Sequence, residues 1–148
     1  MEIAILALGC FWGPEIKFSK LDGVCKTEVG YCGGNSSHTN YTEVCTGKTN
    51  HAEVVKLEFD NSKITYEEIL NFFFETHDPT SLNKQGLDIG TQYRSEIFCL
   101  NDEQKKIAKN VLEKFNKQYN GKMVTKISQI KNYCKAEEYH QKYLEKKL

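Results

Sequence analysis

The chain has 148 residues, enough for one domain whose core buries roughly two-thirds of the surface that the unfolded chain exposes. Hydrophobic residues make up 39% and charged residues 27%, and no apolar run approaches the ~18 residues that a membrane span needs. The formal net charge is zero, which provides no general attraction to nucleic acid or anionic lipid. We therefore expect one soluble domain over residues 1–148 that binds neither membrane nor nucleic acid.

The N-terminal stretch and the cysteines bear on the compartment. MEIAILALGCFWG lacks a basic segment and a small-residue cleavage site, so it predicts a buried strand and not a signal peptide. The six cysteines occur in a chain too long to depend on disulfides, which favours a reducing cytoplasm. No Cys-x-x-Cys pair is present and the four histidines are isolated, so we expect neither a metal site nor a thioredoxin-type redox pair.

The first predicted strand leads directly into the first predicted helix. Ile3–Leu8 is a continuous apolar run followed at once by Gly9, which predicts a buried strand. Pro14 suits the first turn of a helix, and apolar residues continue at helical spacing to Leu21. Cys10 therefore falls at a strand-to-helix junction.

Two further strands and a helix follow. Residues 25–32 favour a strand ended by a pair of glycines, and a polar loop then runs over 33–50. The sequence AEVVKLEF at 52–59 predicts another strand. A capping box of the Thr-x-x-Glu type then opens a helix over 65–76.

The second half begins with a long polar segment and ends with a helix. Residues 77–95 have no clear period, and connections longer than ~12 residues in compact domains tend to be functional, so this segment is the first place to look for a site. Residues 96–100 predict a strand, and an asparagine-capped amphipathic helix spans 101–119. A strand over 123–130 and a short helix over 136–144 complete the predicted elements.

The predicted order of elements defines the fold class. The order β-α-β-β-α-β is that of the ferredoxin-like split βαβ core, an antiparallel sheet backed by helices. A C-terminal helix, strand and helix extend it. We therefore predict a single α+β domain with this core and no internal repeat or linker.

Cys10 is the first candidate for chemistry. A thiol reacts as its thiolate, and a helix N-terminus favours the anion, so this position is expected to lower the pKa of Cys10 from ~8.5. Gly9 and Gly13 permit close approach of the backbone, and Phe11 and Trp12 suit the wall of a small apolar pocket. The alternative is that Cys10 is a small buried hydrophobe and the two aromatic residues are core.

The residues around Cys10 resemble the active-site signature of a known family. GCFWG at 9–13 is similar to the signature of the methionine sulfoxide reductase A family. Further similar blocks follow in the family's order, namely GYCGG at 30–34, HAEVV at 51–55, HDPT at 77–80, QGLDIGTQYRS at 85–95 and AEEYHQKYL at 136–144. The resemblance covers nearly the whole chain, and several ordered blocks are far more specific than one.

The resemblance implies an activity and roles for particular residues. It implies reduction of the S epimer of methionine sulfoxide, free or within proteins, to methionine, with Cys10 as the nucleophile. It also implies roles for six other residues: Phe11 and Trp12 as the pocket for the substrate's methyl group, Glu53 as the acid near the sulfoxide oxygen, Tyr31 and Tyr93 as hydroxyl donors to that oxygen, and Asp88 as a polar group that helps hold the substrate.

These implied roles agree with what the reaction needs. The sulfoxide oxygen must be hydrogen-bonded and protonated as the S–O bond breaks, which suits a carboxylic acid and two phenols. Glu53 would have to be protonated near neutral pH, so we expect a desolvated site that raises its pKa above ~4.3. Without the resemblance, the preferred interpretation is that Glu53 is an exposed acid at a strand start and that Tyr31 and Tyr93 are half-buried structural phenols. His51 and His140 are either polar residues beside the site or structural histidines.

The attack would leave Cys10 as a sulfenic acid, which condenses readily with a second thiol. Many family members carry resolving cysteines beyond the YHQKYL block, whereas this sequence stops at Leu148. Cys134 and Cys32 are the candidates for an internal resolving thiol; the alternative is direct attack by an external thiol, from thioredoxin or from glutathione with glutaredoxin. The remaining cysteines are expected to be structural, namely Cys25, Cys45 and Cys99.

The expected partners follow from this chemistry. The electrons arrive as thiols, so no organic or metal cofactor is expected, and the substrates are oxidised proteins and free methionine sulfoxide. We expect a monomer. Two other hypotheses stay open at this point: a thiol peroxidase or thiol–disulfide oxidoreductase, which would not need the acid and phenols, and a module that binds oxidised methionine or a metal without catalysis.

Overall fold

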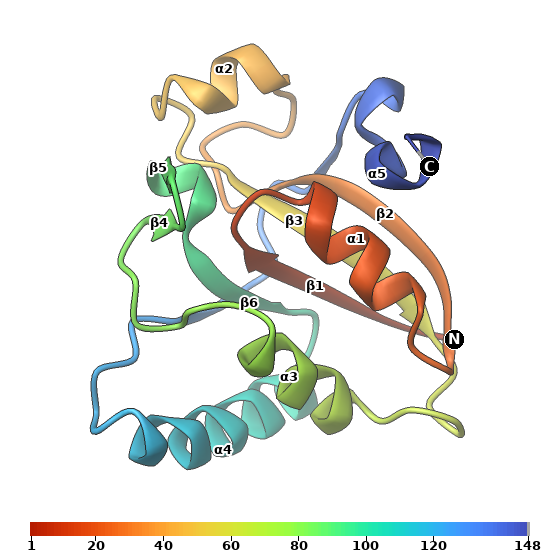
Figure 1. The fold of residues 1–148 in the computed structure, drawn as a ribbon, viewed down its shortest axis with the longest axis vertical. Coiled ribbons are helices and arrows are strands. Elements are labelled where there is room, and N and C mark those ends of the chain that lie inside the picture. Colours follow the sequence, from red (N-terminus) through yellow and green to blue (C-terminus); the bar gives the residue numbers. More distant parts are fainter. Residues whose placement is uncertain (148) are drawn as a thin grey trace.

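The computed structural model describes residues 1–147 and centres on one six-stranded sheet (Figure 1). Leu148, the last residue of the predicted domain, lies outside the described residues. The strands of this sheet are β1 (Glu2–Leu8), β2 (Val24–Cys32), β3 (Ala52–Phe59), β6 (Ser95–Cys99), β7 (Lys126–Gln129) and β8 (Cys134–Lys135). They are ordered β7-β6-β1-β3-β2-β8, and a separate hairpin pairs β4 (Lys84–Gln85) with β5 (Asp88–Ile89).

In the described part of the chain, five α-helices and two short 3-10 helices accompany the strands. The predicted capping box is present, because Thr65 and Glu68 exchange side-chain and backbone hydrogen bonds at the start of α3. Within residues 1–147 no helix is both long and apolar enough to cross a membrane. The helices are α1 (Trp12–Ser19), α2 (Tyr41–Cys45), α3 (Tyr66–Glu75), η1 (Thr91–Tyr93), α4 (Asp102–Gln118), η2 (Glu138–His140) and α5 (Tyr143–Lys146).

The central four strands confirm the ferredoxin-like prediction. β6, β1, β3 and β2 lie side by side, and each neighbouring pair is antiparallel. Beyond this core the sheet extends at one edge, where β7 pairs with β6 in parallel. The reason is that α4 carries the chain back over the sheet between these two strands, which is the connection that a parallel pair requires.

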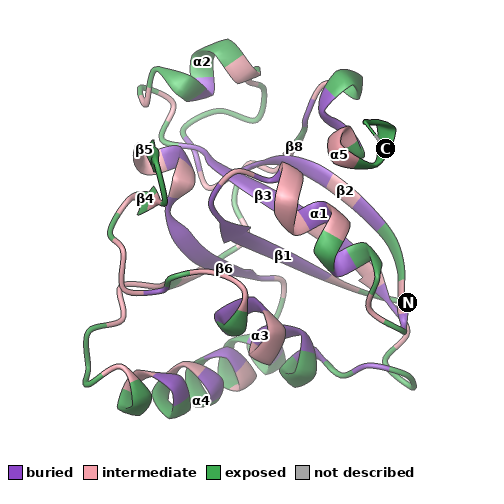
Figure 2. Cartoon of the chain, in the orientation of Figure 1, coloured by how far each residue is buried: buried purple, intermediate pink, exposed green. Residues whose placement is uncertain are grey.

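Alternating side chains divide the sheet into two faces. The face covered by α1, α3 and α4, called the helix face here, carries Tyr31, Val55 and Leu57 within the main hydrophobic cluster. The far face carries Cys32 and Val54 in a smaller cluster. Figure 2 shows the central strands buried along most of their length, while the outer side of α4 is exposed.

Two local predictions differ from the structure. The polar loop over 33–50 contains the short helix α2, whose N-terminus is capped by the Asn40 side chain. The predicted helix over 136–144 is wrong, because the chain there forms η2 and then α5. Tertiary contacts explain this: Gln141 makes hydrogen bonds with both backbone groups of Val29, and Lys142 takes a left-handed conformation with φ of 51°.

Candidate functional site

Cys10 lies in the turn between β1 and α1, as the sequence predicts. Gly9 before it has a φ of +101°, and a Cβ there would sit 2.9 Å from the Gln85 side chain. Only glycine therefore fits, and its absence of a side chain lets the β4–β5 hairpin pack against the turn that holds the thiol. The Cys10 side chain itself is half-buried.

The protonation state of Cys10 differs from the prediction. Burial raises the pKa of this thiol to about 11, although the backbone N–H of Trp12, at the start of α1, acts to lower it. The negative charges of Glu53 and Asp88 raise it further. The expected lowering by the helix N-terminus is thus outweighed by desolvation, and Cys10 is a neutral thiol at pH 7 in the unliganded protein.

Glu53 lies on β3, on the helix face, and is only 1% exposed. One carboxyl oxygen, Oε1, accepts a hydrogen bond of 3.2 Å from the backbone N–H of Phe11, next to Cys10. The other oxygen, Oε2, is buried without a partner among the described residues. Burial raises the pKa of Glu53 to about 8, so the group holds a proton at neutral pH.

The long segment over 77–95 brings two polar side chains to this place. Tyr93 ends η1 and is half-buried; burial and the charges of Glu53, Asp88 and Cys10, among others, raise its pKa to about 12. Asp88 is exposed on β5, and its charge raises the pKa of both Glu53 and Cys10. Gln85 of β4 packs against Gly9, so the hairpin of this segment lies beside the turn that holds Cys10.

Tyr31 is directly opposite Glu53 in the β2–β3 register. Its ring is fully buried, and its hydroxyl donates a hydrogen bond of 2.8 Å to Oε1 of Glu137. The other oxygen of Glu137 accepts the backbone N–H of Tyr41 at 2.9 Å. The single hydroxyl proton of Tyr31 is therefore already committed, which differs from the free donor that the family resemblance implies.

The two aromatic residues after Cys10 have different surroundings. Phe11 is 1% exposed and belongs to the main hydrophobic cluster, with its ring centroid 5.7 Å from that of Tyr31. Trp12 is only half-buried; its Nε1–H donates to Nδ1 of His140 at 3.1 Å, and its ring stacks on Tyr143 with centroids 3.8 Å apart. Trp12 thus exposes part of its indole ring, and contacts with His140 and Tyr143 fix the position of that ring.

The two predicted resolving cysteines lie on opposite faces of the sheet. Cys32 is fully buried in the cluster of the far face, so the sheet separates it from Glu53. Cys134 is on β8, directly opposite Tyr31, and its Sγ lies 3.7 Å from the carbonyl oxygen of Thr39. The structure therefore brings Cys134, and not Cys32, to the helix face.

The structure adds residues to which the sequence argument assigned no role. Glu137 holds Tyr31, and Tyr143 stacks on Trp12. Both belong to the AEEYHQKYL block, whose resemblance to the family was the available signal. Cys45, expected to be structural, is exposed on α2. Partial burial raises the pKa of its thiol, and the charges of Glu53 and Glu137 raise it further. Within residues 1–147, no group of three or more His, Cys, Asp or Glu side chains is placed to hold a metal ion.

The arrangement combines a thiol, a buried protonated carboxyl, a phenol and an indole wall around one turn of the chain. A neutral acid with an unpartnered oxygen can donate a proton to a bound oxygen atom, and the phenol can donate a hydrogen bond to it. A nearby thiol can then attack the atom that carries that oxygen. The set therefore suits removal of an oxygen atom from a small, partly apolar substrate.

Comparison with known proteins gives consistent matches. A family model described as peptide methionine sulfoxide reductase matches residues 2–148. Peptide methionine sulfoxide reductase MsrA of Pelagibacter ubique is 70% identical over 147 residues, which cover 99% of this chain and all of that relative. Among solved structures, reduced Mxr1 from Saccharomyces cerevisiae is 40% identical with a TM-score of 0.94, covering 98% of this chain and 84% of that one. Mxr1 in complex with Trx2 is 28% identical with a TM-score of 0.69, covering 96% and 84%.

Proposed function

This chain belongs to the peptide methionine sulfoxide reductase family, and on that premise we propose that it is a single catalytic domain whose Cys10 reduces methionine-S-sulfoxide, free or in proteins. The chain is an oxidoreductase that repairs oxidised methionine at the expense of thiols. The observation that carries the assignment of the site is the buried Glu53 carboxyl beside the Cys10 turn, which is protonated at neutral pH and has one oxygen without a partner among residues 1–147.

The proposed binding mode follows from the polar and apolar sides of the site. The methyl group of the substrate lies against Trp12 and the edge of Phe11. The sulfoxide oxygen faces Oε2 of Glu53 and the hydroxyl of Tyr93, and Asp88 lies where it can hold the polar part of the substrate. Tyr31 contributes a hydrogen bond to that oxygen only when its hydroxyl leaves Glu137.

The proposed chemical step balances without an added oxidant or cofactor. Sγ of Cys10 attacks the sulfoxide sulfur while Glu53 gives its proton to the departing oxygen, and the thiol proton of Cys10 then restores Glu53. The attack forms an S–S bond between Cys10 and the substrate. The hydroxyl group then moves from the substrate sulfur to Sγ, so that this S–S bond and the substrate's S–O bond break as the S–O bond of the sulfenic acid forms. The substrate sulfur gains two electrons, the sulfur of Cys10 loses two, and the products are methionine and a sulfenic acid.

A second thiol then reduces the sulfenic acid, forming a disulfide and releasing water. We propose Cys134 as the internal resolving thiol, because it lies on the helix face. β8 is three strand spacings, roughly 14 Å, from β1, whereas a disulfide needs Cα atoms within ~7 Å. The Cys134 segment must therefore move toward Cys10. Cys32 would have to cross the sheet, and we do not propose it.

A dithiol of the thioredoxin type is the proposed final reductant. The crystallised complex of the relative Mxr1 with Trx2 supports this choice over glutathione with glutaredoxin. The cytoplasm is the proposed compartment, because a cycle that consumes thiols needs a reducing environment. A monomer and the absence of a resident cofactor remain predictions.

Anaerobic single-turnover reduction of methionine-S-sulfoxide by the prereduced protein tests these proposals, with free thiols counted before and after. The wild type should form methionine and lose two thiols. Cys134→Ser should lose one and retain a sulfenic acid, while Cys32→Ser is the matched control and should lose two. If the wild type forms methionine and loses one thiol, an external thiol resolves Cys10. If it forms no methionine, the proposed function fails.

A further inference from the structure

Glu15 is a buried acid on α1 that the proposed chemistry does not use. It is only 2% exposed, and both of its carboxyl oxygens have partners. Oε2 accepts the hydroxyl hydrogen of Thr27 on β2 at 2.9 Å. Oε1 accepts the backbone N–H of Lys142 at 2.6 Å, across 127 residues of chain. Glu15 therefore ties the helix that follows the nucleophile to the C-terminal segment.

Lys142 is held in an unusual backbone conformation at this contact. Its φ of 51° lies in the left-handed region, which a lysine adopts only when surrounding contacts impose it. Lys142 is also the N-cap residue of α5, so its conformation sets the direction in which α5 begins. The next residue, Tyr143, is the one whose ring stacks on Trp12, with an angle of 12° between the planes.

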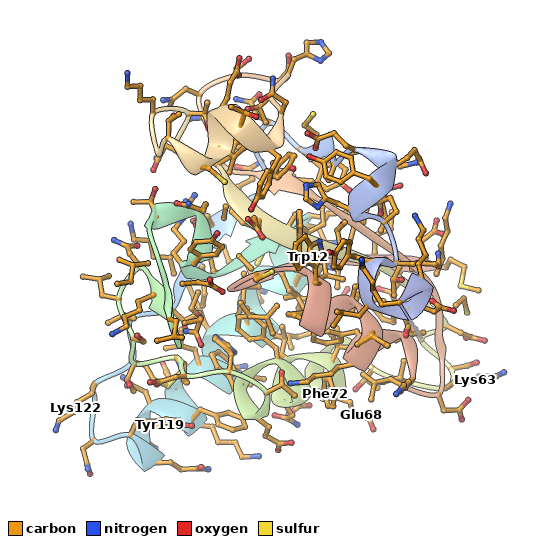
Figure 3. All side chains as sticks on the ribbon, turned by 45° about the horizontal axis from the view of Figure 1, so that its top comes forward. Trp12, Lys63, Glu68, Phe72, Tyr119 and Lys122 are labelled. Atoms are coloured by element: carbon orange, nitrogen blue, oxygen red, sulfur yellow. The ribbon has the colours of Figure 1, made fainter. Side chains whose placement is uncertain are left out.

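Trp12 and Glu15 are three residues apart on α1, so their side chains project from the same face of the helix. This face therefore contacts consecutive residues of the C-terminal segment, Lys142 through a carboxylate and Tyr143 through an indole. Figure 3 shows Trp12 beside that segment. The strained turn at Lys142 is what brings Tyr143 flat against the indole.

We propose that Glu15 is a positioning residue for the substrate pocket, acting through Lys142 and Tyr143 on Trp12. A carboxylate can accept from Thr27 and from Lys142 at once, and hydrogen bonds to a charged acceptor are among the stronger ones. The inference rests on the proposed role of Trp12 as the wall for the substrate's methyl group. It assigns part of the substrate affinity to an acid that never touches the substrate.

A merely structural Glu15 would fasten α1 to β2 through Thr27, and its loss would lower stability without changing the pocket. The structural role and the positioning role can be distinguished because the contacts of Glu15 with Thr27 and with Lys142 can be removed in different combinations. Thr27→Val removes only the contact to β2, whereas Glu15→Leu removes both contacts at similar side-chain volume. Glu15→Gln is the conservative rescue, since its amide oxygen can accept from Lys142 while its NH₂ donates to the Thr27 hydroxyl.

The chain has one tryptophan, so its intrinsic fluorescence reports on Trp12 alone. In Glu15→Leu the emission maximum should shift to longer wavelength and acrylamide quenching should increase, because the indole gains contact with water. The KM for methionine sulfoxide should rise about tenfold, equivalent to about 1.4 kcal/mol of binding, with kcat nearly unchanged, as expected for a lost binding contact. Thr27→Val and Glu15→Gln should resemble the wild type in both measurements.

The same Glu15→Leu change in a Tyr143→Leu background tests the route. If Glu15 acts through Tyr143, the KM of the double variant should be almost the same as the KM of Tyr143→Leu alone. Should Glu15→Leu not fold, Glu15→Asp, which keeps the charge but withdraws the carboxylate, should give smaller shifts in the same direction. Wild-type fluorescence and KM in the folded Glu15 variants would overturn the proposal. Because fluorescence needs no turnover, this outcome is distinct from an inactive wild type, which would refute the proposed function.

Discussion

The backbone N–H of Phe11 donates a hydrogen bond of 3.2 Å to Oε1 of Glu53, and so joins the turn that carries the nucleophile to the buried carboxyl of β3. This contact fixes one carboxyl oxygen and leaves the other free. The proton that burial keeps on Glu53 is therefore available at Oε2, where the sulfoxide oxygen is proposed to bind.

The first prediction concerns the pH dependence of sulfoxide reduction. The pKa of Glu53 is about 8, and only its protonated form can act as the acid. Cys10 attacks as a thiolate, whose fraction rises with pH up to its pKa of about 11. The single-turnover rate should therefore rise with pH up to about 8 and level off above it, because loss of the Glu53 proton then offsets the gain in thiolate. Glu53→Gln should lower the rate on the order of 10²–10⁴-fold and should remove the levelling near pH 8. A wild-type rate that rises as steeply between pH 8 and 9 as it does below pH 8 would contradict the assignment.

The second prediction concerns stability. The folded state keeps a proton on Glu53 up to about pH 8, whereas the unfolded chain loses it near ~4.5. Between these values the folded state binds more protons, so this group makes the free energy of unfolding fall as the pH rises. Relative to the wild type, Glu53→Gln should thus gain stability from pH 5 to pH 8, on the order of a few kcal/mol. Urea unfolding of both proteins at pH 5 and pH 8 measures this difference. An equal change in the free energy of unfolding between the two pH values in both proteins would contradict the prediction.

The third prediction separates the two phenols. The hydroxyl of Tyr31 donates to Glu137. The pKa of Tyr93 is raised by burial and by nearby charges, and none of its causes within residues 1–147 is a hydrogen bond of its hydroxyl. Tyr93→Phe should therefore lower kcat/KM on the order of 10²-fold, as for loss of one donor to a reacting oxygen. Tyr31→Phe should have a clearly smaller effect on kcat/KM. The reverse ranking would mean that substrate draws Tyr31 away from Glu137.

The fourth prediction concerns the reactivity of the free thiol. With a pKa of about 11, Cys10 should hold roughly 100-fold less thiolate at pH 7 than an unperturbed cysteine. Alkylation by iodoacetamide, followed by mass spectrometry of the Cys10 peptide, should be slower than that of the exposed Cys25 in the same sample. Faster labelling of Cys10 at pH 7 would show that the helix N-terminus dominates after all.

The parts of the fold that were predicted from sequence depend on local signals. The capping box at Thr65 and Glu68 and the apolar run of β1 are written within a few adjacent residues, and both elements formed where expected. The C-terminal segment was not predicted, because its conformation depends on Val29 and Glu15, more than a hundred residues earlier. No local pattern in residues 136–144 carries that information.

The features of the site, too, could be predicted from the sequence only where they depend on neighbouring residues. The strand-to-helix position of Cys10 and the family resemblance of its neighbours could be read from the sequence. The pKa of Cys10 could not, since burial by residues from other elements reverses the effect of the helix N-terminus. The engagement of Tyr31 by Glu137 and the face on which Cys32 lies also depend on strand register, which only the folded sheet defines.

The hydrogen bond between Trp12 and His140 spans 128 residues of sequence. Contacts of such separation close a large loop, and their entropic cost delays them in folding. The indole wall should therefore form among the last features of the domain, after β1 and α1 have already presented Cys10. Until this contact closes during folding, Cys10 lacks one wall of its pocket and is more open to oxidants than in the folded protein.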